Sequence, residues 1–228
     1  MAKLRFVESV TSAVEDYAKA IYALETRCDG AVSTNALAER LGVSAASASS
    51  MVKKLDSLGL VSHVPYRGVQ LTPAGAKVAL EVIRHHRLLE RFLAEELGVP
   101  WDRVHDEAEV LEHVLSEDLE AIIAAKLGHP TTDPHGDPIP SADLVIDEHP
   151  TDAMDSIAPG SGGTFVRISD SDPEMLRYLA ARGIKPGDRF EVVDKQPFDG
   201  PLFARFGDDV HVLGGALAKA MRVEVDHQ

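Results

Sequence analysis

Two short helical stretches separated by a tight turn constrain the fold of this chain more than any other feature. Apolar side chains recur at three- and four-residue spacing over residues 36–41 and again over residues 44–58, which is typical of helices with one buried face. Gly42 ends the first stretch and allows a sharp turn, and Ser44 is a residue type that caps the start of a helix. The sequence therefore predicts a helix-turn-helix.

The flanking segments extend this arrangement. A helical pattern over residues 9–28 precedes it, and two short apolar runs at residues 60–64 and 69–71 follow it. Residues 65–68 between these runs are turn formers, so the two runs predict a β-hairpin. Helix, short helix, turn, helix and hairpin in this order predict a winged helix-turn-helix.

The helix that begins at Ser44 has the composition of a DNA recognition helix. Its small side chains allow close approach to base edges, and its hydroxyl groups can bond bases or phosphates. We favour DNA binding over a three-helix bundle without a DNA role, because turn, helix and wing occur in the right order. The residues predicted to contact double-stranded DNA are Ser44, Ala46, Ser47, Ser50, Lys53 and Lys54, with Arg67 at the tip of the hairpin.

The net charge of −14 argues at first against a nucleic-acid partner. However, residues 1–75 carry eight Lys/Arg and seven Asp/Glu, a sum of +1, whereas residues 76–140 sum to −8 and residues 141–228 to −7. The excess of acid thus lies outside the predicted DNA-binding segment. The modest positive charge of that segment implies modest affinity for one copy, which two copies on a palindrome would overcome.

The rest of the chain divides into segments of different character. Helical patterns over residues 72–97 and 101–126 predict two or three helices, and residues 128–163 are rich in Gly, Pro and Asp. Short apolar runs after residue 164, with one helical pattern at 173–182, suggest a small barrel. We therefore expect a mainly α N-terminal part and a small C-terminal β-barrel. The predicted domains are a winged helix-turn-helix at 1–75, a helical domain at 76–140, a linker at 141–163 and a barrel at 164–228.

Side chains of the types that bind metal ions gather in the helical domain. Two imidazoles and two carboxylates at positions i, i+4, i+7 and i+8 would share one helix face and suit a first-row divalent ion. A second pair, His86 and Glu90, is also four residues apart, and by itself we interpret it as a surface pair on a charged helix. The four residues of the first group are His105, Glu109, Glu112 and His113.

The sequence argues against an enzyme and against a membrane protein. The zinc-protease motif, the nucleophile elbow and the phosphate-binding loop are absent. Cys28 is the one cysteine, so no internal disulfide can form, which fits a reducing compartment. Neither a signal peptide nor a membrane-spanning run is recognisable, so we expect a cytoplasmic protein.

Taken together, these motifs resemble the diphtheria-toxin-repressor family of metal-dependent transcription regulators. The resemblance covers nearly the whole chain and adds an SH3-like (FeoA-like) identity for the C-terminal barrel. It implies a homodimer that a metal ion activates to repress metal-transport genes, with residues 76–140 serving dimerisation and metal binding. The matching motifs are the winged helix, residues 86–91, residues 104–108, Glu112-His113 and the loop at 136–140.

The resemblance also implies two metal sites. The primary site would consist of Asp16 from the first helix, Glu109, Glu112 and His113. The ancillary site would consist of His86, Glu90, His105 and a carboxylate of the C-terminal domain, with Asp172 the best match and Asp170 the alternative. His135 would join it, because it lies with Asp133 in a loop that supplies ancillary ligands in some manganese-responsive members.

Three positions bear on the identity of the metal. Iron-responsive members carry Met and Cys where this chain has Asp16 and Glu109, and oxygen ligands favour a harder ion. We therefore expect Mn²⁺, with Fe²⁺ as the alternative. Lys19 stands where some manganese-responsive members carry a second glutamate, which puts a binuclear site of their type in doubt.

Two further classes of function remain open. The chain could be a metal-independent regulator whose ligand cluster is structural, and DNA binding that resists chelators would reveal this. It could also be a scaffold that binds a peptide through the SH3-like domain. Trp101 is the one tryptophan and lies outside that domain, so the sequence offers no aromatic-rich groove there.

Overall fold

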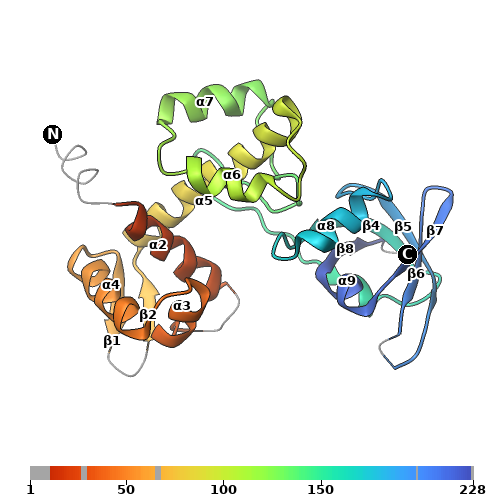
Figure 1. Ribbon diagram of the computed structural model, residues 1–228, viewed down its shortest axis with the longest axis horizontal. Helices are drawn as coiled ribbons and strands as arrows, with labels where there is room; N and C mark the ends of the chain where they lie inside the picture. The colour runs from red at the N-terminus through yellow and green to blue at the C-terminus, as the bar shows by residue number, and fades with distance from the viewer. Residues whose placement is uncertain (1–10, 27–29, 65–67, 199, 227–228) are drawn as a thin grey trace. The chain divides into compact units, whose positions relative to one another are not determined.

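A winged helix-turn-helix forms at the N-terminal end of the chain, as the sequence predicts (Figure 1). The structure is a computed structural model that describes residues 11–26, 30–64, 68–198 and 200–226. The helices of this part are α2 (Ser12–Glu25), α3 (Thr34–Arg40) and α4 (Ala45–Ser57), and its antiparallel wing strands are β1 (Val61–Val64) and β2 (Gly68–Leu71).

Local interactions explain why α3 and α4 begin and end where they do. The Ser33 hydroxyl accepts a hydrogen bond from the backbone N–H of Ala36, and the Ser44 hydroxyl accepts one from Ser47, 3.1 Å in each case. Gly42 takes φ of +64°, a left-handed conformation that costs glycine little, and so turns the chain between the helices. The buried faces of α2, α3 and α4 share one core with both wing strands.

Three further helices follow: α5 (Pro73–Leu97), α6 (Val104–Leu111) and α7 (Glu117–Lys126). The chain divides into two compact units, and the boundary falls within α5. The first unit comprises Met1–His85, Glu112–Leu115 and Pro140–Val145, and the second comprises His86–Leu111, Ser116–Ile139 and Ile146–Gln228.

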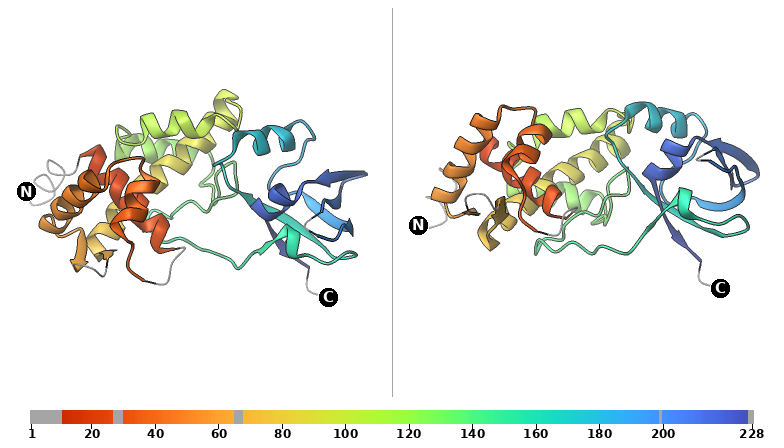
Figure 2. Two further views of the ribbon diagram at one scale, coloured as in Figure 1. Left: turned by 60° about the horizontal axis from the view of Figure 1, so that its bottom comes forward. Right: turned by 90° about the horizontal axis from the view of Figure 1, so that it is seen from below.

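The C-terminal part of the second unit contains an antiparallel sheet (Figure 2). Its strand order is β3-β8-β4-β5-β6-β7. Buried side chains of the sheet share one core with helices α8 and α9, including Phe165, Leu176 and Leu217. The elements are β3 (Asp152–Ala153), η1 (Met154–Ser156), β4 (Gly162–Ile168), α8 (Pro173–Ala180), β5 (Arg189–Lys195), β6 (Leu202–Phe206), β7 (Asp209–Leu213), α9 (Gly215–Ala220) and β8 (Met221–Val225).

The expected fold class is confirmed, with two corrections of detail. Among the described strands, β3 and β7 lie at the two edges of the sheet and do not pair with each other, so the sheet does not close into a barrel. The segment predicted as a linker, 141–163, contains β3, η1 and the first residues of β4, and Met154 is fully buried in the C-terminal core. A two-residue strand and a single helical turn are too short to show a periodic pattern, which is why the sequence did not reveal them.

The loop after α7 is held against both helical and sheet elements of the second unit. The guanidinium groups of Arg87 and Arg91 on α5 donate to the carbonyls of Pro138 and Asp133, respectively. Gly136 takes φ of +90°, and a Cβ there would lie 1.9 Å from the carbonyl oxygen of Val166 on β4. Only glycine allows so close an approach, so this loop is positioned by backbone geometry.

The described segments contain no helix that combines the length and the apolarity needed to cross a membrane.

Candidate DNA interface and metal centres

The predicted DNA contacts on α4 lie on the side away from the core, and Ser44 caps the start of this helix. Ala48, Val52 and Leu55 face the core, whereas the predicted contact residues point away from it. Arg67 lies outside the described residues. The exposed members of the predicted set are Ser44, Ala46, Ser47, Ser50, Lys53 and Lys54.

A first group of metal-ligand side chains lies within the first unit. Asp16 on α2 and the adjacent pair Glu112 and His113, just after α6, bring one ligand atom each to within 4.8 Å of the others. His113 Nε2 is 2.9 Å from Asp16 Oδ1 and 3.5 Å from Glu112 Oε1. We call Asp16, Glu112 and His113 the primary cluster.

Two neighbours of the primary cluster were not among the ligands predicted from the sequence. Glu15 accepts a hydrogen bond from His113 Nδ1 at 2.6 Å, and Lys19 donates from Nζ to Glu112 Oε1 at 2.6 Å. Glu15 and Lys19 lie on α2 close to Asp16 in the chain, so the helix places both side chains near the cluster. The sequence did not reveal these two contacts, because the partner of each residue lies far along the chain and no periodic pattern connects them.

The donor chemistry of the primary cluster fits a divalent metal ion. Both ring nitrogens of His113 face carboxylate oxygens, from Glu15 on one side and from Asp16 on the other. A neutral imidazole has only one N–H, so the second nitrogen can face a carboxylate only with a proton or a metal ion between them. Carboxylate and imidazole ligands without sulfur suit Mn²⁺ and Fe²⁺.

A second group, centred on Glu90, lies within the second unit. Glu90 Oε1 is 3.0 Å from His86 Nε2 and 3.4 Å from His105 Nδ1, and His105 Nδ1 is 2.8 Å from Asp170 Oδ2. We call His86, Glu90, His105, His135 and Asp170 the ancillary cluster. The Glu90 side chain is only 1% exposed, so the interpretation of His86 and Glu90 as a surface pair is wrong.

Strong electrostatic coupling marks the ancillary cluster. The hydrogen bond to Asp170, followed by the one to Glu90, raises the pKa of His105 to about 10 despite the opposing effect of burial. Burial disfavours the charged form of Glu90, but hydrogen bonds from His105 and His86 outweigh it and hold the pKa of Glu90 well below its usual range. The cluster therefore holds ionised carboxylates that require positive charge beside them.

The loop residue His135 turns one ring nitrogen toward Glu90. Its Nε2 donates to the backbone carbonyl of Trp101 at 2.7 Å, and its Nδ1 lies 3.9 Å from Glu90 Oε1. Asp133 is buried beside them, and burial followed by the charge of Asp137 raises the pKa of the Asp133 carboxyl well above its usual range. Donation from Nε2 leaves Nδ1 as the nitrogen that can bind a metal.

Two of the predicted ligands are placed differently from the rest. Asp172 caps α8 by accepting a hydrogen bond from the backbone N–H of Glu174 at 2.9 Å, and Asp170 is the carboxylate that reaches His105. Glu109 belongs to the second unit, where its Oε1 lies 3.8 Å from ring nitrogens of both His86 and His105. The prediction of one continuous helical face from His105 onward also fails, because α6 ends at Leu111.

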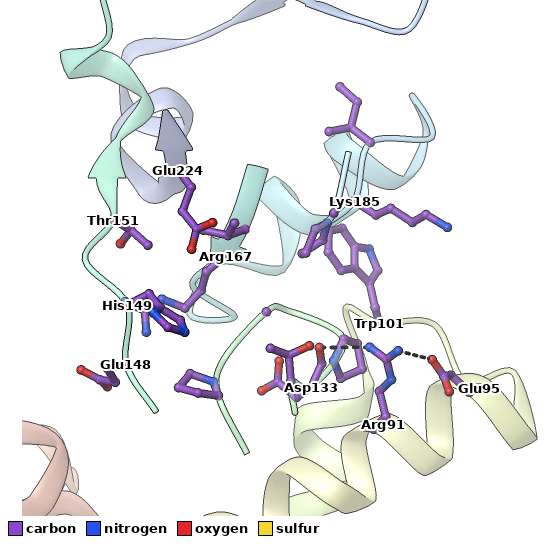
Figure 3. Close-up of a pocket in the computed structure, with 18 of the residues that line it drawn as sticks. Arg91, Glu95, Trp101, Asp133, Glu148, His149, Thr151, Arg167, Lys185 and Glu224 are labelled. Carbon is purple, nitrogen blue, oxygen red and sulfur yellow. Dashed lines mark hydrogen bonds and ion pairs between the residues drawn. The ribbon is translucent and has the colours of Figure 1, made fainter. Parts of the chain in front are cut away.

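An open groove of about 840 Å³ borders the Asp133 loop within the second unit (Figure 3). Arg91 lines it, with its guanidinium 3.4 Å from the carbonyl oxygen of Asp133 and 2.6 Å from Glu95 Oε1. Trp101 and Arg167 contribute to its walls (Figure 3). The Glu95 carboxylate on one side and the backbone carbonyl of Asp133 on the other hold the Arg91 guanidinium against the loop that carries His135.

Three family models match successive parts of the chain. A family model described as the N-terminal DNA binding domain of iron dependent repressors matches residues 9–69. A second, described as the metal binding and dimerisation domain of iron dependent repressors, matches residues 72–141, and the FeoA domain matches residues 153–225.

The diphtheria toxin repressor of Corynebacterium efficiens is 33% identical over 229 residues, covering 96% of this chain and 97% of its own. The iron-dependent repressor IdeR of Mycobacterium leprae is 39% identical over 232 residues, covering 96% of this chain and 99% of its own. The solved structure of a manganese-dependent transcriptional repressor in complex with manganese has a TM-score of 0.84 and 45% identity, covering 93% of this chain and 99% of that one.

A winged helix followed by a helical domain rich in metal-ligand residues and by an FeoA domain defines a metal-dependent DNA-binding regulator. The chain belongs to the diphtheria-toxin-repressor family of metal-dependent transcriptional repressors. The family resemblance drawn from the sequence is confirmed.

Proposed function

We propose that the chain is a manganese-activated transcriptional repressor that binds palindromic operators of metal-transport genes as a homodimer. The observation that carries this proposal is the primary cluster, in which Asp16, Glu112 and His113 offer only oxygen and nitrogen ligands. Two of these three ligands are carboxylates, which suit Mn²⁺. The 45% identity to a manganese-dependent repressor supports the same metal.

The position of Asp16 explains how metal binding would control DNA binding. Asp16 lies on α2, whose buried face shares the winged-helix core with α4, whereas Glu112 and His113 belong to the segment after α6. A bound divalent ion would supply the positive charge that offsets these carboxylates. Ligands from both segments would then hold α2 in one position, and through the shared core they would fix the recognition helix for DNA.

Exposed apolar side chains support the proposed dimer. Leu119 and Ile122 on α7 are three residues apart, so they share a helix face, and Ile122 is 64% exposed. Val110 on α6 is exposed as well. The family model for this segment is a dimerisation domain, and a two-fold dimer would match a palindromic operator.

We also propose the ancillary cluster as a second metal site, with His86, Glu90, His105, Asp170 and His135 as ligands. Glu109 contributes to the primary site in the sequence-based assignment, and its distance of 3.8 Å from His86 Nδ1 also makes it available to the ancillary cluster. Iron activation is the second candidate function, because one of the relatives described above is an iron-dependent repressor and two of the matching family models describe iron dependent repressors.

The test is a DNA-binding titration with the full-length chain stripped of metal. DNA duplexes enriched from a random library in the presence of Mn²⁺ would be labelled, and fluorescence anisotropy would follow binding as Mn²⁺ or anaerobic Fe²⁺ is added. We expect Mn²⁺ to raise DNA affinity by roughly 5–150-fold, the range of typical allosteric coupling. Stronger activation by Fe²⁺ at equal free concentration would favour the iron function.

Variants separate the ligand role from nonspecific effects. Asp16→Ala should abolish activation, whereas His149→Ala should leave it unchanged, because His149 is an exposed histidine outside both clusters. DNA affinity that does not change with Mn²⁺, Fe²⁺ or Asp16→Ala would rule out metal control.

A further inference from the structure

The contact between Lys19 and Glu112 places a positive charge beside the primary cluster. Lys19 lies on α2 one helical turn after Asp16, and its side chain is 20% exposed. Its Nζ donates to Glu112 Oε1 at 2.6 Å, and the Glu112 side chain is 0% exposed. A buried carboxylate requires a positive partner, so Lys19 stabilises the ionised form of Glu112 in the metal-free chain.

The carboxylate oxygen that Lys19 contacts also faces the candidate metal position. Glu112 Oε1 is 3.5 Å from His113 Nε2, and this nitrogen is 2.9 Å from Asp16 Oδ1. An ion bound by these groups would therefore lie close to the ammonium group of Lys19. Two positive charges beside one buried carboxylate are only weakly screened by water, so the ammonium group and the metal ion would repel each other.

We propose that Lys19 is an internal counter-cation that lowers the metal affinity of the primary cluster and thereby sets the metal concentration at which the repressor responds. The proposal rests on the proposed function, because it takes Asp16, Glu112 and His113 as metal ligands. In the metal-free chain Lys19 neutralises Glu112, and a divalent ion must bind against its charge.

This role differs in its consequences from a purely structural one. Removing the ammonium group leaves Glu112 buried without this partner, so the metal-free chain becomes less stable. The same change removes the repulsion between the ammonium group and the metal ion, so the metal-bound chain becomes more stable relative to the metal-free chain. A residue that merely held Glu112 in place would, on removal, lower both the stability and the metal affinity.

The test is a comparison of the full-length chain with Lys19→Met, which keeps a long unbranched side chain without the charge. Mn²⁺ affinity would be measured by competition with a fluorescent metal indicator, and thermal unfolding would be followed with and without Mn²⁺. We expect Lys19→Met to unfold at a lower temperature when metal-free and to bind Mn²⁺ at least about tenfold more tightly. Lys19→Gln serves the same purpose if the methionine variant does not fold.

Two controls accompany this comparison. Lys19→Arg keeps the charge and should keep the Mn²⁺ affinity close to that of the parent chain. Lys77→Met removes a lysine of the same unit whose Nζ is 3.8 Å from Glu81 on the exposed side of α5, and it should change neither quantity.

The outcomes distinguish the inference from the proposed function. Unchanged or weaker Mn²⁺ binding by both Lys19→Met and Lys19→Gln overturns the inference alone, provided that the parent chain binds Mn²⁺ and loses it in Glu112→Gln. A parent chain whose Mn²⁺ binding does not depend on Glu112 overturns the proposed primary site and the inference with it.

Discussion

Replacing Glu15 by alanine is a direct test of how the primary cluster is organised. Glu15 is not a member of the cluster, but its Oε2 accepts a hydrogen bond from His113 Nδ1 at 2.6 Å. This bond keeps the proton on Nδ1 and turns Nε2 toward Asp16 and Glu112. In Glu15→Ala the ring is no longer held in that orientation, so Nε2 is less well aimed at the position that the metal should occupy.

The expected loss can be bounded from the geometry. Loss of a carboxylate that orients a metal-bound histidine typically costs about 10–100-fold in metal affinity. The Glu15 side chain is 24% exposed, so water partly replaces the lost hydrogen bond and screens the lost charge. We therefore expect the lower end of that range, roughly tenfold, or about 1.4 kcal/mol of binding free energy.

The assay combines Mn²⁺ affinity with a spectroscopic readout. In ¹⁵N spectra of the metal-free, histidine-labelled chain, the Nδ1–H signal of His113 should show a strong hydrogen bond in the parent and lose it in Glu15→Ala. Glu15→Gln keeps an oxygen acceptor and should recover most of the affinity. An Mn²⁺ affinity in Glu15→Ala equal to that of the parent would refute the reasoning, whatever the stability of the variant.

Three further predictions concern other parts of the molecule. Because Asp170 and Glu90 raise the pKa of His105 to about 10, a metal ion that binds at the ancillary cluster must displace a proton. The metal affinity of this cluster should therefore rise about tenfold per pH unit from neutral pH toward pH 10. Calorimetry in buffers of different ionisation enthalpy would show the released proton, and a metal affinity independent of pH contradicts the prediction. Gly136→Ala should destabilise the chain by roughly 2–5 kcal/mol, because the backbone is left-handed and the added Cβ would overlap the Val166 carbonyl; an unchanged denaturation midpoint would argue against this close approach. Lys54→Ala should weaken binding to all DNA sequences alike and reduce the slope of log affinity against log salt by about one; a variant that altered only the sequence preference would place Lys54 at base edges instead.

Local rules account for the elements that the sequence predicted well. Ser44 and Gly42 mark the start of α4 and the turn before it, and these effects depend on hydrogen bonds and backbone angles within four residues. The apolar spacing of Ala48, Val52 and Leu55 likewise defines which face of α4 is buried. The winged helix was predictable for this reason.

Ligand residues were predictable as types but not always as positions. Asp170 and Asp172 are two residues apart in a loop, and nothing in their composition says which one reaches His105. The structure answers this through the cap of α8, since Asp172 accepts the hydrogen bond of the Glu174 N–H and so begins the helix.

The sequence by itself determined the order of the longer elements and the recognition helix, because helix periodicity and capping are local, and its resemblance to the repressor family supplied the ligand types of both metal-ligand clusters. The tertiary structure alone decided the partners of the charged groups. Lys19 and Glu15 meet Glu112 and His113 only because α2 lies beside the segment after α6 in the first unit. A charge is stabilised by whatever group the fold brings within a few ångströms, and the positions of such groups along the chain carry no period.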